Sequence, residues 1–397
     1  NNAMEQIYQQ IRRYIDKQRL PMMNLWEELV NTESGTRQIE GVNAVGSILR
    51  REMERSGIAT RVIGVENAGD MLIGEWNSES DAAPLLMIGH MDTVFKEGAA
   101  KENPFRVDED GMAHGPGVLD MKAGLVIALY AVKALIETGW KKRPIKFIFA
   151  SDEENLHMFS NAKELFARES RGALAAFNFE TGYMDNRFVV GRNGGGPVIL
   201  QVHGIASHSG IAPEKGRSAV LEAAHKIVEI EAQNDIPRGR LINCGLVTGG
   251  IGENTIPDIC TIRIGIRFPN TTVRDEIFDI LKKATEHSTV PDTTAELDLS
   301  RVMQCMDTTD GVMALFAHLK RTAADCGFGE IESFRVGGLS DSGITVGCGV
   351  PTVCGMGVRG EWNHTPNEYA EVESLYQRCI LAACAACTLE DDFMKAK

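Results

Sequence analysis

Residues 85–95 read LLMIGHMDTVF, and this stretch decides the fold that we expect for the chain. Its uninterrupted apolar run is typical of a strand buried on both faces of a parallel sheet. The run ends on His90 and Asp92, which are two residues apart and therefore share one face of an extended chain. A surface turn after a buried strand would give the same pattern, so this stretch alone favours neither a structural nor a chemical role.

Five more acidic or imidazole residues stand at similar points, at the ends of apolar runs or in irregular segments. In chain order they are Asp120 in HGPGVLDMKAG, Glu153 and Glu154 in FIFASDEE, Glu180 in FNFETG and His364 in WNHTPNE. Together with His90, this set supplies the two imidazoles and three carboxylates expected for a pair of zinc ions that share one carboxylate. One glutamate is then left for proton transfer.

Most members of this set have an ordinary structural explanation when taken alone. Asp120 stands where a helix N-cap is expected. Glu153 and Glu154 could form a solvated acidic loop, and a single histidine such as His364 in an irregular segment is usually incidental. Glu180 is harder to explain, because a carboxylate beside a core strand costs free energy unless it is paired or bound to metal.

The surrounding sequence predicts an α/β fold, a mixed and largely parallel sheet with helices on both faces. The strand-like runs between residues 59 and 179 are ATRVIG, DMLIGEW, APLLMIG, PIKFIFA and ALAAFNF. Helices are expected over residues 37–57, with Gly57 as C-cap, and over residues 121–138. Ligands of such sheets collect beyond the carboxyl ends of the strands, which is where most of the residues above stand.

From the glycine cluster at residues 191–196 onward the pattern changes. Strand, helix, strand, strand, helix and strand signals follow one another, which is the order of a ferredoxin-like domain. Because His364 lies beyond these signals, we predict that this domain is inserted into the catalytic one. We place the catalytic domain at residues 1–192 and 306–397 and the inserted domain at residues 193–305.

These motifs, in this order, resemble a known family, the two-zinc metallopeptidases that include glutamate carboxypeptidase, succinyl-diaminopimelate desuccinylase, acetylornithine deacetylase and aminoacylase. The resemblance extends from about Leu25 to about Val372, and the glutamate carboxypeptidase branch looks the most similar. The motifs that carry it are GHMDTVF, GPGVLDMKAG, DEE, GIASHSGIAPEKGRSAV, GGLSDSG and HTPNE. The resemblance implies a zinc-exopeptidase-like catalytic domain and an inserted domain through which two copies form a homodimer.

The resemblance also implies a role for each residue of the set. The two ligand groups are His90, Asp120 and Glu180 for one zinc, and Asp120, Glu154 and His364 for the other. Glu153 is expected to be the general base. Asp92 is expected to accept the second ring N–H of His90 and so to orient that ligand. A cis peptide bond is expected between Asp120 and Met121.

Three residues outside the ligand set match the family's substrate-binding residues. His208 in GIASHSG is expected to reach the active site of the neighbouring subunit and to stabilise the oxyanion. Asn254 in GENTIPD is assigned likewise. Arg335, just before GGLSDSG, matches an arginine that binds a substrate carboxylate, a task that suits a planar guanidinium. Taken alone, His208 is a surface-loop histidine, and Arg335 could equally form a structural ion pair.

One segment departs from the family pattern. After DEE, members usually continue with a Gly-Ser-x-Gly-Ser stretch, whereas this chain has Leu156, His157 and Phe159 at the small or hydroxyl positions and keeps only Ser160. These larger side chains are expected to reshape the pocket beside the base. We interpret His157 as a histidine at a helix start beside acidic residues, in preference to a metal ligand.

Composition argues against several other classes of protein. The chain has 397 residues, 43% hydrophobic and 24% charged, which is ordinary for a globular protein of two or three domains. Its net charge of −14 argues against nucleic-acid binding, because the phosphates would be repelled. No apolar run approaches the ~20 residues of a membrane helix, and MEQIYQQIRRYIDKQRL is unlike a secretory signal. Nine cysteines fit reduced thiols in a cytoplasmic protein. We expect Cys384 and Cys387 to lie on a helix and to pack in the protein core.

We therefore expect a cytoplasmic, homodimeric, metal-dependent hydrolase that cleaves a peptide or N-acyl amide bond next to a free carboxylate. Its expected cofactors are two Zn²⁺ ions per subunit, although Co²⁺ or Mn²⁺ would suit the same donors. Glu180 and Arg335 favour a carboxypeptidase-like activity on a small peptide or N-acyl amino acid. The alternatives are an N-deacylase or desuccinylase of a small amino-acid derivative, and a non-catalytic metal-dependent binding protein. Retention of Glu153 and of all five ligands argues against the second.

Overall fold

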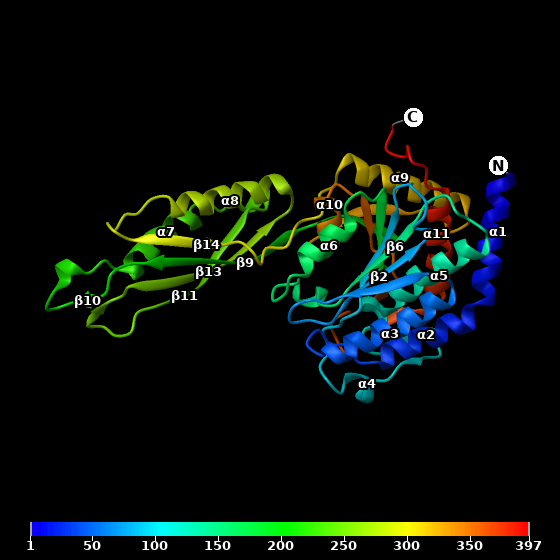
Figure 1. Ribbon diagram of the computed structural model, residues 1–397, viewed down its shortest axis with the longest axis horizontal. Helices are drawn as coiled ribbons and strands as arrows, with labels where there is room; N and C mark the ends of the chain where they lie inside the picture. Colours follow the sequence, from blue (N-terminus) through cyan, green and yellow to red (C-terminus); the bar gives the residue numbers. More distant parts are fainter. Residues whose placement is uncertain (1, 396–397) are drawn as a thin grey trace. The chain divides into compact units, whose positions relative to one another are not determined.

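The strand that ends in His90 lies inside an eight-stranded sheet of the computed structural model, which describes residues 2–395 (Figure 1). All six residues of this strand, β3, are buried, as expected for a strand covered on both faces. In order across the sheet, the strands are β1 (Ala59–Ile63), β2 (Met71–Trp76), β6 (Ile145–Ala150), β3 (Leu85–His90), β7 (Ala175–Asn178), β16 (Thr352–Cys354), β8 (Arg187–Arg192) and β15 (Glu332–Val336).

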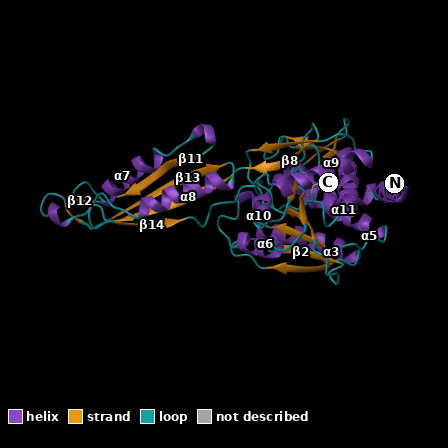
Figure 2. Ribbon diagram, turned by 90° about the horizontal axis from the view of Figure 1, so that it is seen from above, coloured by secondary structure: helices purple, strands orange, loops and turns teal. Residues whose placement is uncertain are grey.

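The central strands β6, β3, β7 and β16 pair in parallel, whereas β1 with β2, β2 with β6, and β16 with β8 pair antiparallel. Helices lie on both faces of this sheet. Figure 2 shows α6 (Ala162–Ser170) and α10 (Ser342–Gly347) on one side, and α5 (Ala123–Glu137) and α11 (Val372–Thr388) on the other. The predicted mixed, largely parallel sheet with helices on both faces is confirmed.

Helix α5 contains the apolar sequence AGLVIALYAVKAL, and every residue from Ala123 to Leu135 is buried. It packs against both β3 and α11, which explains why it is apolar on all sides. The helix begins at Ala123, two residues later than predicted. The reason is that Asp120 and Met121, in the preceding irregular turn Val118–Lys122, have non-helical backbone angles.

The first unit contains further helices and a second, smaller sheet. Its other helices are α1 (Asn2–Lys17), α2 (Arg19–Asn31), α3 (Ile39–Arg55), α4 (Ala99–Glu102) and α9 (Asp310–Asp325). A small antiparallel sheet consists of β17 (Gly360–Glu361), β18 (Tyr369–Glu371), β5 (Met112–His114) and β4 (Arg106–Val107). Gly57 follows α3 with a φ of 78°, which fits the predicted C-cap.

A second compact unit comprises Arg192–Asp307 and Gly337–Leu339, and the rest of the described chain forms the first. In chain order its main elements are β9 (Gly194–His203), α7 (Ala219–Glu231), β11 (Leu241–Gly249), β13 (Ile259–Phe268), α8 (Thr271–Thr285) and β14 (Thr294–Asp298). The antiparallel sheet has the order β11, β13, β9, β14. The predicted ferredoxin-like pattern is therefore confirmed.

Local sequence explains the elements of this second unit. Strand β13 buries every second residue from Cys260 to Phe268, and these side chains form a core with α7 and α8. Both helices begin at capping side chains. Ser218 accepts a hydrogen bond from the N–H of Leu221, and Asn270 accepts one from the N–H of Val273.

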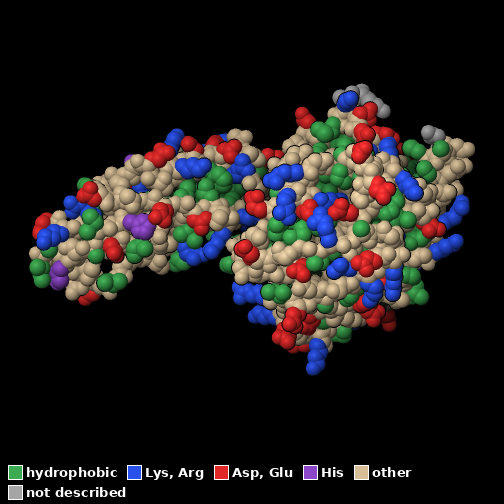
Figure 3. Space-filling view, in the orientation of Figure 1, with side chains coloured by type: hydrophobic (Ala, Val, Ile, Leu, Met, Phe, Trp, Pro, Cys, Tyr) green, Lys and Arg blue, Asp and Glu red, His purple; other side chains and the backbone are tan. Residues whose placement is uncertain are grey.

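The surface and the cysteines have the following features. No helix within residues 2–395 combines the length and the apolar character that crossing a membrane requires. On the face shown in Figure 3, Lys and Arg side chains are interspersed with Asp and Glu, so this face presents no continuous basic patch. All nine cysteines are free. Cys384 and Cys387 are buried on α11, as predicted.

Candidate metal centre

The side chains predicted to hold metal meet at one edge of the eight-stranded sheet. His90 is the last residue of β3, Glu153 and Glu154 follow the end of β6, and Glu180 follows the end of β7. Strand β3 is parallel to both β6 and β7, so the carboxyl ends of these three strands lie side by side. This is the edge at which open α/β sheets bind their ligands.

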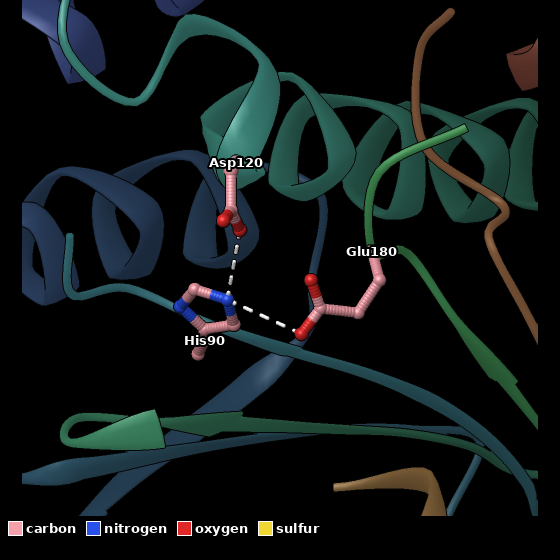
Figure 4. Close-up of side chains that lie close together, drawn as sticks. All are labelled: His90, Asp120 and Glu180. Atoms are coloured by element: carbon pink, nitrogen blue, oxygen red, sulfur yellow. Dashed lines mark ion pairs between the residues drawn. The ribbon is translucent and has the colours of Figure 1, made fainter. Parts of the chain in front are cut away.

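His90 lies at the centre of one group of side chains. Its Nε2 atom is 3.2 Å from Glu180 Oε1 and 3.3 Å from both Asp120 Oδ1 and Glu153 Oε2. Figure 4 shows the carboxylates of Asp120 and Glu180 turned toward this nitrogen. Glu154 Oε1 is 3.8 Å away, and His90, Glu153 and Glu154 also form a group whose possible ligand atoms lie within 4.8 Å of one another. Four carboxylates thus converge on one imidazole nitrogen.

His364 forms a second group that shares a carboxylate with the first. Its Nε2 atom is 2.8 Å from Asp120 Oδ2 and 3.2 Å from Glu154 Oε2, and its side chain is 51% exposed. Possible ligand atoms lie within 4.8 Å of one another both in His90, Asp120 and Glu180 and in Asp120, Glu154 and His364. Asp120 presents one oxygen to each histidine, as two bridged metal ions require. The cluster is buried at His90 and opens to solvent at His364.

The backbone around Asp120 is held by Glu368. The buried carboxylate of Glu368 accepts hydrogen bonds from the N–H groups of Gly117, Leu119 and Asp120, at distances of 3.0, 3.1 and 2.8 Å. The peptide bond between Asp120 and Met121 is cis, as the resemblance implied. Asp120 does not cap α5, so its interpretation as an N-cap is wrong. Glu368 was not predicted as a site residue, although it is the last residue of the motif HTPNE.

Asp92 holds His90 and the acidic loop together. His90 Nδ1 is 2.9 Å from the main-chain oxygen of Asp92 and 3.3 Å from its carboxylate Oδ1. The same carboxylate accepts hydrogen bonds from the Thr36 hydroxyl at 2.6 Å and from the N–H groups of Glu153 and Glu154 at 3.1 and 3.0 Å. With Nδ1 directed to Asp92, Nε2 of His90 faces the cluster. No motif in the sequence pointed to Thr36.

Burial and mutual repulsion shift the ionisation of the carboxylates. Burial raises the pKa of Glu153 well above its usual range; His90 lowers it, and Glu180 raises it further. Burial raises the pKa of Glu154 to about 8, and the nearby carboxylate of Asp120 adds to this shift. Asp120 behaves differently. Burial raises its pKa, but the hydrogen bond to His364 and the nearby imidazole of His90 outweigh burial and lower it.

The nearby carboxylates raise the pKa values of the two histidines. Hydrogen bonds to Asp120 and Glu154 raise the pKa of His364 to about 10. Burial lowers the pKa of His90, but Glu180 and Glu153 outweigh burial and raise it well above its usual value. In the protein without cations, protons on the imidazoles and on the glutamates therefore offset the charge of the clustered carboxylates. Divalent cations would displace those protons.

The donors present fit divalent cations. Nε2 of His90 and Oδ1 of Asp120 are buried, and within residues 2–395 neither atom has a hydrogen-bond partner. A buried polar atom without a hydrogen-bond partner costs free energy. Coordination to a metal would satisfy both atoms. Imidazole nitrogen and carboxylate oxygen are donors that zinc accepts readily.

His208 and Asn254 lie together on the second unit. Both are exposed; His208 belongs to strand β10 (Ser207–His208), which pairs with β12 (Thr255–Ile256), and the carbonyl of Asn254 accepts the N–H of Ser209 at 2.9 Å. His208 Nδ1 accepts hydrogen bonds from the N–H groups of Gly210 and Ile211, at 3.2 and 3.1 Å. In a neutral ring the hydrogen is therefore on Nε2.

Arg335 lies on β15, the edge strand of the eight-stranded sheet, away from the three strands that carry the cluster. Its side chain is exposed, and its NH1 group donates a hydrogen bond to the hydroxyl of Thr308 at 3.0 Å. The structure thus places Arg335 on the catalytic unit but outside the group of side chains that surround His90.

The segment that departs from the family pattern is a turn between Glu154 and α6. His157 does not stand at a helix start, because α6 begins only at Ala162, so that interpretation is wrong in its position. The acidic residues expected beside His157 are present. The buried ring lies between the carboxylates of Asp152 and Asp341, and it belongs to none of the possible ligand groups found within residues 2–395.

Comparisons with known proteins agree with this geometry. The family described as Peptidase family M20/M25/M40 matches residues 86–387. Carboxypeptidase G2 of Pseudomonas sp. (strain RS-16) is 28% identical over 367 residues, which cover 90% of this chain and 86% of that protein.

Two solved structures share the fold. Aminopeptidase PepT from Bacillus cereus superposes with a TM-score of 0.67 at 23% identity, over 93% of this chain and 98% of that chain. The Bacillus subtilis YXEP protein, described as a dinuclear metal-binding peptidase from the M20 family, superposes with a TM-score of 0.59 at 16% identity, over 94% and 98% of the two chains.

Proposed function

Because the chain belongs to peptidase family M20/M25/M40, we propose that it hydrolyses a peptide or N-acyl amide bond next to a free carboxylate. It is a metal-dependent peptidase or amidohydrolase. The observation that carries the proposal is the pair of possible ligand groups that share Asp120 at the edge of the sheet. Carboxypeptidase G2, to which the chain is similar over most of its length, supports a substrate with a free carboxylate.

Two Zn²⁺ ions per subunit are proposed as the cofactors. The ligands would be His90, Asp120 and Glu180 for one ion, and Asp120, Glu154 and His364 for the other. When bound, such ions activate a water molecule at neutral pH and polarise the carbonyl group of an amide. Co²⁺ or Mn²⁺ would suit the same nitrogen and oxygen donors.

Glu153 is proposed to take the proton of the attacking water and to pass it to the departing amine. Its side chain is 6% exposed and lies at the carboxyl end of β6 among the ligands. Asp92 fixes the loop that carries it and at the same time orients His90. Burial raises the pKa of Glu153, and a raised pKa suits a carboxylate that must carry a proton near neutral pH.

Three further residues are proposed to bind the substrate. Arg335 would bind its carboxylate, a task that suits a planar guanidinium. His208 would donate its Nε2 hydrogen to the oxyanion, since its Nδ1 atom is already an acceptor. Asn254, on the segment paired with His208, would bind the substrate beside it.

We also propose that the second unit forms a homodimer, so that His208 acts in the active site of the partner copy. Strand β11 is the edge of its sheet, and an unpaired edge can extend by pairing with a second strand. Helix α7 packs against β11. Both elements expose large apolar side chains: Val220, Leu221, Val228, Leu241, Leu246 and Val247. Exposed apolar side chains on two elements that pack together support an interaction site there.

The nine free cysteines support a cytoplasmic location, where thiols stay reduced. The proposed partners are a small peptide or N-acyl amino acid and a second copy of the chain, with no nucleic acid or membrane.

The test compares zinc-dependent hydrolysis of an N-acyl glutamate with hydrolysis of its C-terminal amide. Cleavage of the free acid alone, lost in Glu153→Ala and weakened through KM in Arg335→Ala, is the expected result. Equal cleavage of acid and amide would contradict recognition of the carboxylate.

An N-succinyl or N-acetyl amino acid in the same assay tests the main alternative. Faster cleavage of that derivative than of the N-acyl glutamate would favour a desuccinylase or deacylase. Binding of two metal ions with no cleavage of any of these substrates would favour a metal-dependent binding protein.

A further inference from the structure

The ring of His157 is buried between two carboxylates beside the proposed base. Asp152, the residue before Glu153, places an oxygen 2.5 Å from Nδ1, and Asp341 places one 2.6 Å from Nε2. His157 is 1% exposed. Ser160 donates a hydrogen bond to the other oxygen of Asp152 at 2.6 Å. Both ring nitrogens of His157 therefore contact a carboxylate oxygen.

Both ring nitrogens of His157 must donate hydrogen bonds in this arrangement. A neutral imidazole has one N–H and would turn the lone pair of its other nitrogen toward a carboxylate, whereas an imidazolium donates from both sides. Burial by itself lowers the pKa of His157, but Asp341 and Asp152 outweigh burial and raise it to about 10. The ring is thus a cation near neutral pH, held by two charge-assisted hydrogen bonds.

The turn that carries His157 has the backbone shape this contact needs. Leu156 and His157 have φ angles of 57° and 58°, in the left-handed region that residues other than glycine seldom adopt. The N–H of His157 donates to the carbonyl of Asp152 at 3.2 Å. The turn therefore folds back on the residue that precedes Glu153.

Asp341 comes from a distant part of the chain, the segment GGLSDSG before α10. Its Oδ1 atom binds His157, and its Oδ2 atom is buried without a hydrogen-bond partner in the described residues 2–395. The contact between His157 and Asp341 thus joins this segment to the loop that carries Glu153, and the imidazolium balances the buried charge of Asp341.

We propose that His157 is a positioning residue for Glu153, which joins the loop carrying Glu153 to the loop carrying Asp341 and balances the buried charge of Asp341. The inference rests on the proposed function, because it takes Glu153 as the group that moves the proton. It gives a role to the segment in which the chain departs from its family. A serine at this position would offer a hydroxyl but no positive charge.

Two substitutions test the charge balance. His157→Gln keeps N–H donors but removes the positive charge, and adding Asp341→Asn removes one negative charge and restores the net charge of the trio. His157→Gln should lower kcat on an N-acyl glutamate by roughly 10- to 100-fold, with KM within about threefold of wild type. The double variant should recover about tenfold or more of that loss, because the trio again has its wild-type net charge.

His318→Gln is the matched control. It makes the same change at another buried histidine, whose Nε2 atom bonds the carbonyl of Ala385 at 2.9 Å. This variant should keep the wild-type kcat. A loss of kcat equal to that of His157→Gln would show that removing any buried histidine has the effect, and would overturn the inference.

A measurement without substrate separates this inference from the proposed function. In metal-free wild-type protein, ¹⁵N NMR of the histidine ring, assigned through the backbone of residue 157, should show both nitrogens protonated at pH 8. A neutral ring at pH 8, a wild-type kcat in His157→Gln, or a double variant no better than the single one would each overturn the inference. If the wild-type protein cleaves no N-acyl glutamate, the proposed function fails, and the NMR result still decides whether His157 is a fixed cation.

Discussion

The two ends of strand β6 hold carboxylates in opposite charge surroundings. At the amino end, Lys146 Nζ and Arg61 NH1 lie 3.0 and 2.6 Å from the two carboxylate oxygens of Glu169. Burial raises the pKa of Glu169, but hydrogen bonds from Arg61 and Lys146 outweigh it and lower the pKa to about 2. At the carboxyl end, Glu153 and Glu154 lie among other carboxylates, and burial raises the pKa of Glu154 to about 8.

We interpret the amino end as contributing to stability and the carboxyl end as contributing to the proposed chemistry. The carboxylate at the amino end is neutralised by cations of the protein itself, so it stabilises the fold. The carboxyl end gathers carboxylates whose charge is offset by protons unless a metal cation binds, and such an arrangement costs stability until the cation binds. Substitutions at the two ends should therefore separate activity from stability.

The largest effect is expected from Asp120→Asn, at the shared ligand. Both possible ligand groups lose a charged oxygen, so the protein should bind neither ion tightly, and hydrolysis should fall by more than roughly 10³-fold. Metal content after dialysis, measured by atomic spectrometry, checks this expectation. Asp108→Asn removes a carboxylate that pairs with His114 outside the cluster and should retain two ions. Two tightly bound ions in Asp120→Asn would contradict the shared-ligand assignment.

Glu153→Gln should lower kcat by roughly 10²- to 10⁴-fold while both ions stay bound, because it removes only the proton carrier. In the metal-free protein, by contrast, the substitution should leave stability unchanged or raise it. The pKa of Glu153 is raised in the folded state, so folding at pH 7 works against the charged form, and a neutral glutamine avoids that cost. The melting temperature of the metal-free variant should equal or exceed that of wild type. A lower melting temperature would mean that Glu153 stabilises the fold.

His208→Ala asks whether the cluster alone is sufficient for activity. The histidine is exposed and lies on the second unit, so metal content and stability should not change. Loss of an oxyanion donor should lower kcat by roughly 10²- to 10³-fold. His287→Ala, at another exposed histidine of the same unit that pairs with Glu229, is the control and should remain active. Unchanged kcat in His208→Ala would confine catalysis to the first unit.

Glu169→Gln should give the smallest effect, and on stability alone. The folded pKa of about 2 lies below the unfolded value near 4.3, so the stabilisation is fully present above about pH 4.3 and is lost as pH falls toward 2. Denaturant unfolding at pH 7 should show a loss of about 1–2 kcal/mol, a modest value because Arg61 is 46% exposed and solvent screens the pair. At pH 2 the variant and wild type should converge. A change in kcat at neutral pH would contradict the division between the two ends.

The fold and the ligand groups could be predicted because their signals are local. Apolar runs mark the buried strands, and His90, Glu153, Glu154 and Glu180 stand directly after them. Strands that are parallel neighbours bring such residues together wherever they lie in the sequence. The inserted unit could be predicted for the same reason, since its alternating strand β13 and the capped helices α7 and α8 are readable segment by segment.

The supporting contacts could not be predicted, because they join segments far apart in the chain. Glu368 binds the backbone of Asp120, which lies 248 residues earlier in the chain. The Thr36 hydroxyl binds Asp92, which lies 56 residues later in the chain. The N-cap alternative for Asp120 fails for a related reason. Its position before a helix is visible in the sequence, whereas the non-helical backbone angles of Asp120 and Met121, after which the helix begins at Ala123, are not.

A dinuclear metal site that shares Asp120 is best tested by a zinc titration of the metal-free protein in a calorimeter, with hydrolysis of an N-acyl glutamate followed in parallel. Two equivalents of zinc should bind per chain, and activity should rise with their binding and be absent without metal. Binding should also release protons, since His364 and Glu154 hold theirs at pH 7 in the metal-free state. Binding of one equivalent or none, or full activity in the metal-free protein, would rule out the shared dinuclear site.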